Sequence, residues 1–375
     1  MNYLQYIASA QQTPVTPLFL VSGADAMVSD IIWRNMIDAA YHQNKTLFII
    51  DNTQNGYIPS AGSYKPVDVL NGEVSLCENL LDAGSLKSIS RLRALLSDLG
   101  FDSVKAMKLV QYLQFIRETE NRLGNASSLS PGTLEEYGGV MLVKWKLDTL
   151  LNSGKLSALN YDYLLGRYSE VSAAAADFES FLVMIAPFLG NKSPEKGMAV
   201  HLPFGDFRQD PSMQEMLATL LISYMKQHSK DSTTLILDDG NSDRGFLINI
   251  LKGFPETEVH MFSRDIFTLD ELSMGVLYNR FPLRVYTRHD NMKSCEKVEN
   301  LCGQVDVVKR SSTTTIDKRF RSNSAWNIFL GTNRTETEIR NPASKEARFK
   351  KERINALSLG TGIIDYFGNQ VLFSF

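Results

Sequence analysis

The stretch from Phe19 to Ala40 reads FLVSGADAMVSDIIWRNMIDAA, and it carries the clearest indication of an α/β fold. An apolar run ends in a turn of small residues, and an amphipathic segment follows. Pro17–Ser22 is predicted to be a buried strand, and Asp30–Tyr41 a helix, because apolar residues recur there at helical spacing. A second apolar strand, Thr46–Ile50, completes a βαβ unit, which implies a parallel sheet.

The rest of the chain divides into a helical part and a second α/β part. From about Val74 to Leu189 no pattern of period two occurs, and three segments have helical periodicity; Gly100 is predicted to close one helix and Asp102 to begin the next. Short apolar strands then alternate with helices again, as in a doubly wound sheet. The predicted elements are Met198–Pro203, Ser212–Gln227, Thr233–Leu237, a helix ending near Lys252, Glu258–Phe262, Leu269–Arg280 and Leu283–Tyr286, followed by strands or hairpins at Val305–Ile316, Trp326–Gly331, Gly362–Tyr366 and Val371–Phe375.

Composition bounds the class of protein. The chain has 375 residues, 43% of them hydrophobic, which is enough for more than one domain. The net charge of −3 argues against a molecule that binds polyanions with its whole surface, although residues 309–353 hold twelve Lys/Arg against five Asp/Glu. Three cysteines and five scattered histidines form no disulfide framework and no zinc spacing, so no metal site is expected.

The N-terminus, MNYLQYIASAQQ, lacks the basic region and the long apolar core of a signal peptide. No run reaches the ~18 apolar residues that suggest a membrane helix. We therefore expect a cytoplasmic protein without a membrane span of its own.

The turn after the first strand, SGADAMVS, has the place of a phosphate-binding loop but not its residues. A working loop reads G-x-x-x-x-G-K-[ST], because glycine amides cradle the phosphates, lysine neutralises them and the hydroxyl binds Mg²⁺. In this register the loop positions are filled by Ser22 (first glycine), Gly23, Met27 (second glycine), Val28 (lysine) and Ser29 (hydroxyl). Only Ser29 keeps the motif. The loop alone favours an ordinary βα turn over a decayed site, although free helix amides could still bind an anion weakly.

The segment TLILDDGN, residues 234–241, has the form of a Walker B strand, in which one acid holds the Mg²⁺ water shell and a following Glu polarises the attacking water. Asp238 and Asp239 stand in these two places. Aspartate in the second place is one methylene shorter than glutamate, so its carboxylate would reach the water poorly. A strand end with two solvated acids is the simpler interpretation of this segment alone.

The order of these elements resembles the motor domains of type IV secretion and conjugation ATPases, TraG/TraD-like coupling proteins of the FtsK/HerA-like P-loop superfamily. Those proteins carry a helical domain within a RecA-like fold. Their sensor Thr-Gln-Ser corresponds to FSRDIFTL here, where Ser263 matches the Thr, Arg264 replaces the Gln and Leu269 keeps its place. Their closing helix and hairpin resemble RINALSLGTGIIDYFGNQVLF, residues 353–373.

The resemblance implies a RecA-like α/β domain made of residues 1–73 and 190–375, interrupted by an all-helical domain, 74–189, with a C-terminal hairpin. It also implies a bacterial pseudo-ATPase that serves as a subunit or adaptor in a type IV secretion or conjugative DNA-transfer system. Its partners would be other subunits of an ATPase ring or a relaxosome-like complex. With lysine, second glycine, glutamate and glutamine all replaced, no catalytic residue and no cofactor are expected, beyond weak Mg-ATP binding at most.

Two alternatives remain open from the sequence. A subunit with residual ATP binding or hydrolysis would rebuild its site with Ser29, Asp238 and a lysine or arginine such as Lys45 or Arg34. A nucleic-acid-binding module would use KRSSTTTIDKRFR and KEARFKKER, with Phe320 and Phe349 stacking on bases, although KEARFKKER also fits a surface helix. The candidate phosphate-contacting residues are Lys309, Arg310, Lys318, Arg319 and Arg321.

Overall fold

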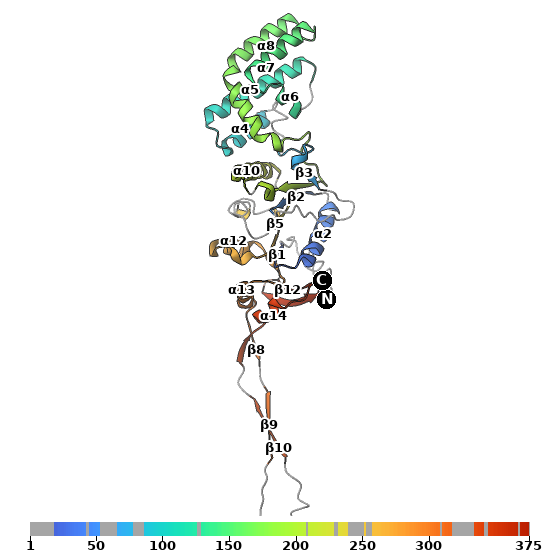
Figure 1. Ribbon diagram of the computed structural model, residues 1–375, viewed down its shortest axis with the longest axis vertical. Helices are drawn as coiled ribbons and strands as arrows, with labels where there is room; N and C mark the ends of the chain where they lie inside the picture. The colour runs from blue at the N-terminus through green and yellow to red at the C-terminus, as the bar shows by residue number, and fades with distance from the viewer. Residues whose placement is uncertain are drawn as a thin grey trace, which may run out of the picture.

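The computed structural model describes residues 19–42, 45–52, 66–77, 86–125, 129–207, 209–228, 232–238, 251–252, 257–307, 310–316, 334–340, 344–366 and 368–374. The molecule is elongated. A block of helices stands at one end, a sheet with flanking helices lies in the middle, and a narrow ribbon of strands extends from the other end (Figure 1).

The central sheet, within the described residues, has nine strands in the order β13-β12-β7-β1-β6-β5-β2-β4-β3. Neighbours from β7 to β3 run parallel, whereas β12 is antiparallel to both β7 and β13. The strands are β1 Phe19–Ser22, β2 Thr46–Asp51, β3 Val67–Asp68, β4 Ala199–Pro203, β5 Ser232–Asp238, β6 Glu258–Ser263, β7 Leu283–Tyr286, β12 Thr361–Tyr366 and β13 Asn369–Ser374. Because all seven parallel strands point the same way, their carboxyl ends share one edge.

Both faces of this sheet are buried, because successive residues of each strand point to opposite sides. In β1, Leu20 joins the larger of two apolar clusters and Val21 the smaller; in β2, Phe48 and Ile49 divide in the same way. Helix α2 covers one face, and α10, α12 and α13 cover the other (Figure 1). Their bounds are α2 Ala26–His42, α10 Pro211–His228, α12 Glu271–Arg280 and α13 Met292–Cys302. The fold is therefore α/β with a mostly parallel sheet flanked by helices, the RecA-like class that the sequence predicts.

The block at one end of the molecule, residues 86–188, consists of helices joined by turns, and none of its described residues lies in a strand. It comprises α4 Leu86–Asp98, α5 Ser103–Arg122, α6 Pro131–Glu135, α7 Val140–Asn152, α8 Ala158–Val171 and α9 Ala175–Ile185, with short 3₁₀ turns Ser172–Ala174 and Ala186–Phe188. The predicted start of α5 is confirmed, because the Asp102 side chain caps it by accepting from the N–H groups of Val104 and Lys105. Gly100, with φ of +84°, lies in the turn after α4.

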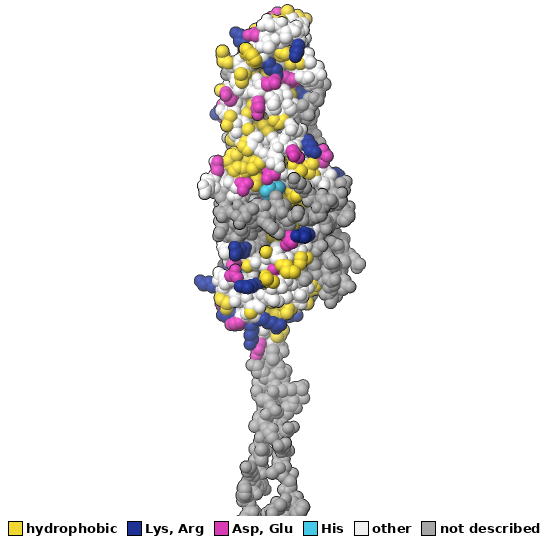
Figure 2. All heavy atoms as spheres, turned by 45° about the vertical axis from the view of Figure 1, so that its right-hand side comes forward, with side chains coloured by type: hydrophobic (Ala, Val, Ile, Leu, Met, Phe, Trp, Pro, Cys, Tyr) yellow, Lys and Arg dark blue, Asp and Glu magenta, His cyan; other side chains and the backbone are white. Residues whose placement is uncertain are grey.

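The run Ala158–Phe188, made of α8, α9 and the turns beside them, is long and apolar enough to cross a membrane by length and composition. Of its most apolar window, 44% is buried inside the molecule. Phe178, Phe181 and Ile185 of α9 are fully buried in the core of the helical block. Packing within the block therefore accounts for only part of the apolar character of this run. Leu159 of α8 is 81% exposed, and hydrophobic side chains are visible on the surface of the block (Figure 2).

The chain enters and leaves this block through two adjacent segments, which we call the neck, residues 72–75 and 189–192. Val74 and Lys192 form a β-bridge, and the Ser75 N–H donates to the Lys192 carbonyl at 2.8 Å. A Cβ atom on Gly190 would lie 2.3 Å from the Val74 carbonyl carbon, so this crossing requires glycine. The division of the chain into two domains at these residues remains our proposal.

Several predicted boundaries are wrong. Helix α2 begins at Ala26, four residues before the predicted start. Val305–Ile316 divides into two strands, β8 Gln304–Val307 and β9 Arg310–Ile316. The segment KEARFKKER does not form one surface helix: it begins in strand β11 Ser344–Ala347 and ends in the short helix α14 Lys351–Asn355. Strand β8 pairs with β11, and β9 with β10 Arg334–Arg340, to form the ribbon. Trp326–Gly331 lies outside the described residues, and α13 was not predicted.

Candidate functional site

The turn between β1 and α2 consists of only three residues, Gly23, Ala24 and Asp25. The sequence register placed Met27, Val28 and Ser29 in the phosphate loop, but α2 already contains them. The reason is that Asp25 caps the helix, so the helix begins immediately after it. Only three residues therefore lie outside the strand and the helix, and they do not form the wide loop that surrounds a phosphate chain.

The Asp25 carboxylate occupies the N-terminus of α2. Its Oδ1 accepts from the Met27 N–H at 3.0 Å and from the Val28 N–H at 3.3 Å, and its Oδ2 accepts from the Gly360 N–H at 2.7 Å. The residue is 2% exposed. A helix N-terminus attracts anions through its unpaired amides and its dipole. Here the chain supplies the anion itself.

The two amides before Asp25 are also bonded within the chain. The Gly23 N–H donates to the Ser263 carbonyl at 3.0 Å, and the Ala24 N–H donates to the Arg288 carbonyl at 2.8 Å. Gly23 has φ of +142°, and a Cβ atom there would lie 1.9 Å from the Thr287 Oγ1. This glycine thus permits close packing of the turn against the chain that leaves β7, and its amide does not face an open cradle.

The side chains at positions 27–29, which the sequence register aligned with the end of the phosphate loop, differ in their exposure. Val28 is fully buried and packs with Ile32 and Trp33 in the cluster between α2 and the sheet. Met27 is 52% exposed. Ser29 is half-buried, and its N–H donates to the Asp25 carbonyl at 3.3 Å. A residue at position 28 therefore extends into the apolar core and not toward the turn.

Ser22, at the end of β1, is fixed by a buried histidine. His289 Nδ1 donates to the Thr287 carbonyl at 2.8 Å, because a carbonyl can only accept. In the neutral ring, Nε2 then accepts from the Ser22 hydroxyl at 3.0 Å, and burial lowers the pKa of His289, which favours that neutral form. The Ser22 Oγ in turn accepts from the Ile266 N–H at 3.3 Å. Ser22 is fully buried, so its hydroxyl has a structural role here.

The acid and sensor positions lie along the same edge of the sheet. Ser22, Ser263 and Asp238 are in register on β1, β6 and β5, so Asp238 is two strand spacings, about 9–10 Å, from Ser22 along the sheet. Asp238 is described here only as the last residue of β5, and Asp239 lies outside the described residues. Arg264, just beyond β6, is exposed. The structure thus brings these positions to one edge, with β6 between the loop and the acid.

Most of the basic residues proposed to bind nucleic acid lie outside the described residues. Lys309, Lys318, Arg319, Arg321 and Phe320 lie outside the described residues, and Arg310 is described only as the first residue of β9. The other proposed stacking residue, Phe349, is only 8% exposed and belongs to the main core. The expectation that Phe349 stacks on bases is therefore wrong.

A second buried polar cluster, which the sequence did not indicate, joins the sheet edge to the segment before the neck. His201 on β4 lies between two carboxylates, with Nδ1 2.8 Å from the Asp68 Oδ2 and Nε2 3.2 Å from the Asp51 Oδ2. Burial alone would lower the pKa of His201, but the two hydrogen bonds and the two negative charges raise it to about 9. Within the described residues, no group of three or more His, Cys, Asp or Glu side chains is arranged to hold a metal ion.

The residues that the sequence analysis missed at the loop are Asp25, His289 and Gly360. Asp25 carried a usable signal, because aspartate directly before an amphipathic segment is a common helix cap. His289 and Gly360 carried none, because each meets the loop from a distant part of the chain. Chemically, the arrangement holds three segments together, and the N–H groups of Gly23, Ala24, Met27 and Val28 already have acceptors within the chain.

No protein-family model and no curated protein sequence matches the chain. Among solved structures, it is similar to the bacterial conjugative coupling protein TrwBdeltaN70 in an unbound monoclinic form, with 11% identity, a TM-score of 0.46, and coverage of 95% of this chain and 83% of that one. It is also similar to the plasmid coupling protein TrwB in complex with ADP and Mg²⁺, with 12% identity, a TM-score of 0.41, and coverage of 95% and 83%.

A third solved structure, VirB4 of Thermoanaerobacter pseudethanolicus, has 11% identity and a TM-score of 0.42, and the match covers 96% of this chain and 88% of that one. The solved structures therefore include conjugative coupling proteins, the class that the order of motifs in the sequence resembles.

Proposed function

We propose that this chain is an ATPase-like subunit that does not turn over ATP and that acts as an adaptor or regulatory subunit of a type IV secretion or conjugative DNA-transfer machine. The observation that carries the proposal is the Asp25 carboxylate, buried at the N-terminus of α2 and hydrogen-bonded to three backbone N–H groups. A nucleotide would have to place its phosphates where this carboxylate lies.

Electrostatics opposes that exchange. Phosphates brought beside Asp25 would meet a like charge in a dry environment, where repulsion between anions is strong. Residue 28 offers no compensating cation, since Val28 lies in the core. In phosphoryl transfer nearly all of the catalysis comes from positioning and from stabilising the phosphoryl charge, so a site without the lysine and the amides loses most of its rate.

In this proposal the loop has a new role, which is to join distant segments. Gly360 precedes β12, and its N–H bond to Asp25 ties the C-terminal hairpin to α2. Thr287, next to β7, meets the same turn, with its Oγ1 3.4 Å from the Asp25 nitrogen. The loop thereby holds in place the flanks that a motor domain would use to contact its neighbours, without a nucleotide to order them.

The partners, the location and the domain division in this proposal follow from the resemblance of the sequence to type IV secretion and conjugation ATPases. The partners would be subunits of an ATPase ring or a relaxosome-like complex in the cytoplasm, and residues 74–189 would form the inserted helical domain. DNA contact through Lys309, Arg310, Lys318, Arg319 and Arg321 is compatible with this role. Asp238, Asp239 and Arg264 would have no catalytic part.

The proposal is tested by mixing the purified chain with the motor ATPase of the same transfer system. Light scattering after size-exclusion chromatography reports complex formation, and a phosphate-release assay reports the ATPase rate of the motor. We expect a complex and a changed motor rate, with no phosphate released by the chain alone. A control mixture contains an unrelated protein of similar size. Neither a complex nor a rate effect, or phosphate release by the chain alone, would count against the proposal.

A further inference from the structure

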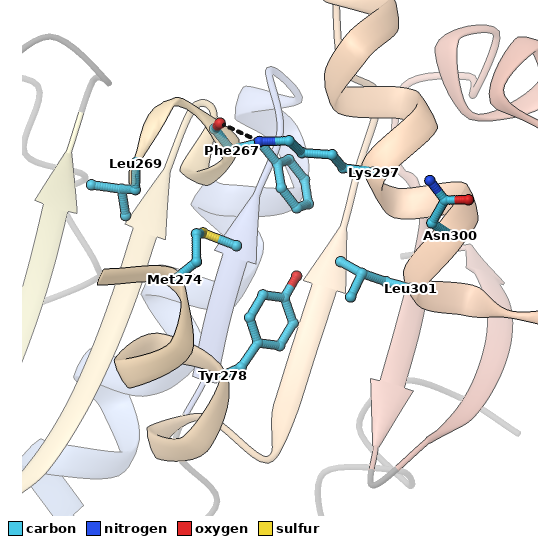
Figure 3. Close-up of a pocket in the computed structure, with 7 residues that line it drawn as sticks. All are labelled: Phe267, Leu269, Met274, Tyr278, Lys297, Asn300 and Leu301. Atoms are coloured by element: carbon cyan, nitrogen blue, oxygen red, sulfur yellow. Dashed lines mark hydrogen bonds between the residues drawn. The ribbon is translucent and has the colours of Figure 1, made fainter. Parts of the chain in front are cut away.

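A pocket of about 310 Å³ opens between α12 and α13 on the flank of the sheet opposite α2 (Figure 3). Its lining residues are Phe267, Leu269, Met274, Tyr278, Lys297, Asn300 and Leu301. Phe267 is buried, whereas Lys297, Asn300 and Leu301, all on α13, are exposed. The pocket therefore has an apolar floor and is open to solvent on the α13 side.

The Lys297 ammonium is held over this floor. Its Nζ donates to the Phe267 carbonyl at 3.1 Å and lies 5.9 Å from the centre of the Phe267 ring. Figure 3 shows the side chain reaching from α13 across the pocket toward Phe267. A lysine side chain held this way is already oriented, so a ligand that binds it loses less side-chain entropy.

Among the side chains that the structure describes, no carboxylate pairs with this ammonium. The nearby acids of α13 are engaged elsewhere, because Glu296 pairs with the Lys351 ammonium at 3.8 Å and the Glu299 carboxylate accepts from the Lys351 N–H. Among the described residues that line the pocket, Lys297 is also the only charged one. The described lining thus combines an apolar floor with a single positive charge.

The walls are partly rigid and partly adaptable. The Tyr278 hydroxyl is 3.0 Å from the Tyr286 hydroxyl, and the Arg284 guanidinium lies 4.3 Å from the centre of the Tyr278 ring, so this ring is fixed. Met274 lies one turn before Tyr278 on the same helix (Figure 3), and methionine adjusts its shape to different apolar groups. A preformed floor with one flexible wall suits the anchor residue of a protein interface.

We propose that this pocket binds a segment of a partner protein that inserts one large apolar side chain and places a carboxylate beside the Lys297 ammonium. The volume lies at the lower end of the roughly 300–1,000 Å³ found for ligand pockets, which suits one anchor side chain. Because the Lys297 ammonium is positive, it favours a partner segment with an acidic group next to the apolar anchor side chain. This site uses other residues than the loop after β1 and does not depend on the proposed function.

N-acetyl-phenylalanine is the smallest probe with both features, and its neutral amide and N-acetyl-alanine are matched controls. Methionine methyl groups labelled with ¹³C provide the NMR readout, and the Met274→Leu variant assigns the Met274 signal. We expect N-acetyl-phenylalanine to shift that signal with a dissociation constant of about 1 mM, as its size allows. The amide should bind roughly three- to ten-fold more weakly, and N-acetyl-alanine should leave the signal unmoved.

Two lysine variants isolate the charge. Lys297→Gln removes the ammonium from the pocket, so the acid and the amide should then bind equally. Lys293→Gln removes an exposed lysine one turn earlier on α13, outside the lining, and should keep the preference for the acid. The proposal is overturned if no probe moves the Met274 signal, if acid and amide bind the native chain equally, or if Lys297→Gln keeps the preference.

Discussion

The Asp25 carboxylate accepts a hydrogen bond of 2.7 Å from the backbone N–H of Gly360, a residue 335 positions later in the chain. The same carboxylate caps α2 through the N–H groups of Met27 and Val28. One buried side chain thus occupies the N-terminus of α2 and connects this helix to the β12–β13 hairpin.

Replacing Asp25 by alanine would leave these three N–H groups without their acceptor. We expect the free energy of unfolding to fall by about 1–3 kcal/mol, the usual cost of losing a cap and leaving buried donors unpaired. Sulfate or phosphate should restore part of the loss by entering the vacated position. Urea unfolding in sulfate and in chloride at equal ionic strength measures both effects.

Asp30→Ala is the matched control, because Asp30 forms a surface ion pair with Arg34 on the same helix. We expect this change to cost less than about 1 kcal/mol and to show no preference for sulfate. If Asp25→Ala unfolds like Asp30→Ala, or if sulfate stabilises both variants and the native chain equally, the carboxylate does not hold an anion position.

We expect that lysine at position 28 does not rebuild a nucleotide site. Val28 is fully buried among apolar residues, so Val28→Lys buries an unpaired charge and should lower the free energy of unfolding by more than about 3 kcal/mol. Met27→Lys, at the adjacent exposed position, should change it by less than about 0.5 kcal/mol. Chemical denaturation compares the two. A stable Val28→Lys protein that binds Mg-ATP would show that residue 28 faces the loop.

The neck depends on the absence of a side chain at Gly190. An alanine Cβ there would overlap the Val74 backbone, so Gly190→Ala should cost about 1–3 kcal/mol or more. Gly166, inside α8, has nothing within 4 Å of its Cβ position, so Gly166→Ala should stabilise the chain by about 0.5–1 kcal/mol. Thermal unfolding of both variants tests this, and equal effects of the two would contradict the close crossing at the neck.

The pair of carboxylates around His201 should make stability depend on pH. The pKa of His201, about 9, is above its ordinary value near 6.5, so the stabilisation is fully present below pH ~6.5 and is lost as the pH rises through about 9. Between pH 6 and pH 10 the native chain should lose about 3 kcal/mol more than the His201→Gln variant. Urea unfolding at these pH values provides the comparison, and parallel curves would contradict the cluster.

Much of the α/β pattern was predictable because buried strands and amphipathic helices leave periodic signals. β2, β4, β5, β6 and β7 each overlap a predicted strand, and the cap at Asp102 was located from the Asp-Ser pair. Helix α13 was missed. The ribbon was only partly predicted, because its strands are polar and leave no apolar alternation.

The site was less predictable, because it depends on residues that meet only in the fold. A motif register counts positions along the chain, and it placed Met27 to Ser29 in a loop that the Asp25 cap turns into helix. The bonds of Gly360 to Asp25 and of His289 to Ser22 span most of the sequence and leave no local signal.

Titration calorimetry of the purified native chain with Mg-ATP and Mg-ADP shows whether the Asp25 carboxylate keeps nucleotide phosphates away from the N-terminus of α2. We predict no binding heat up to about millimolar nucleotide, which corresponds to a binding free energy weaker than about −4 kcal/mol. A micromolar dissociation constant for either nucleotide, measured on the native chain with Asp25 present, would show that this carboxylate does not exclude phosphates.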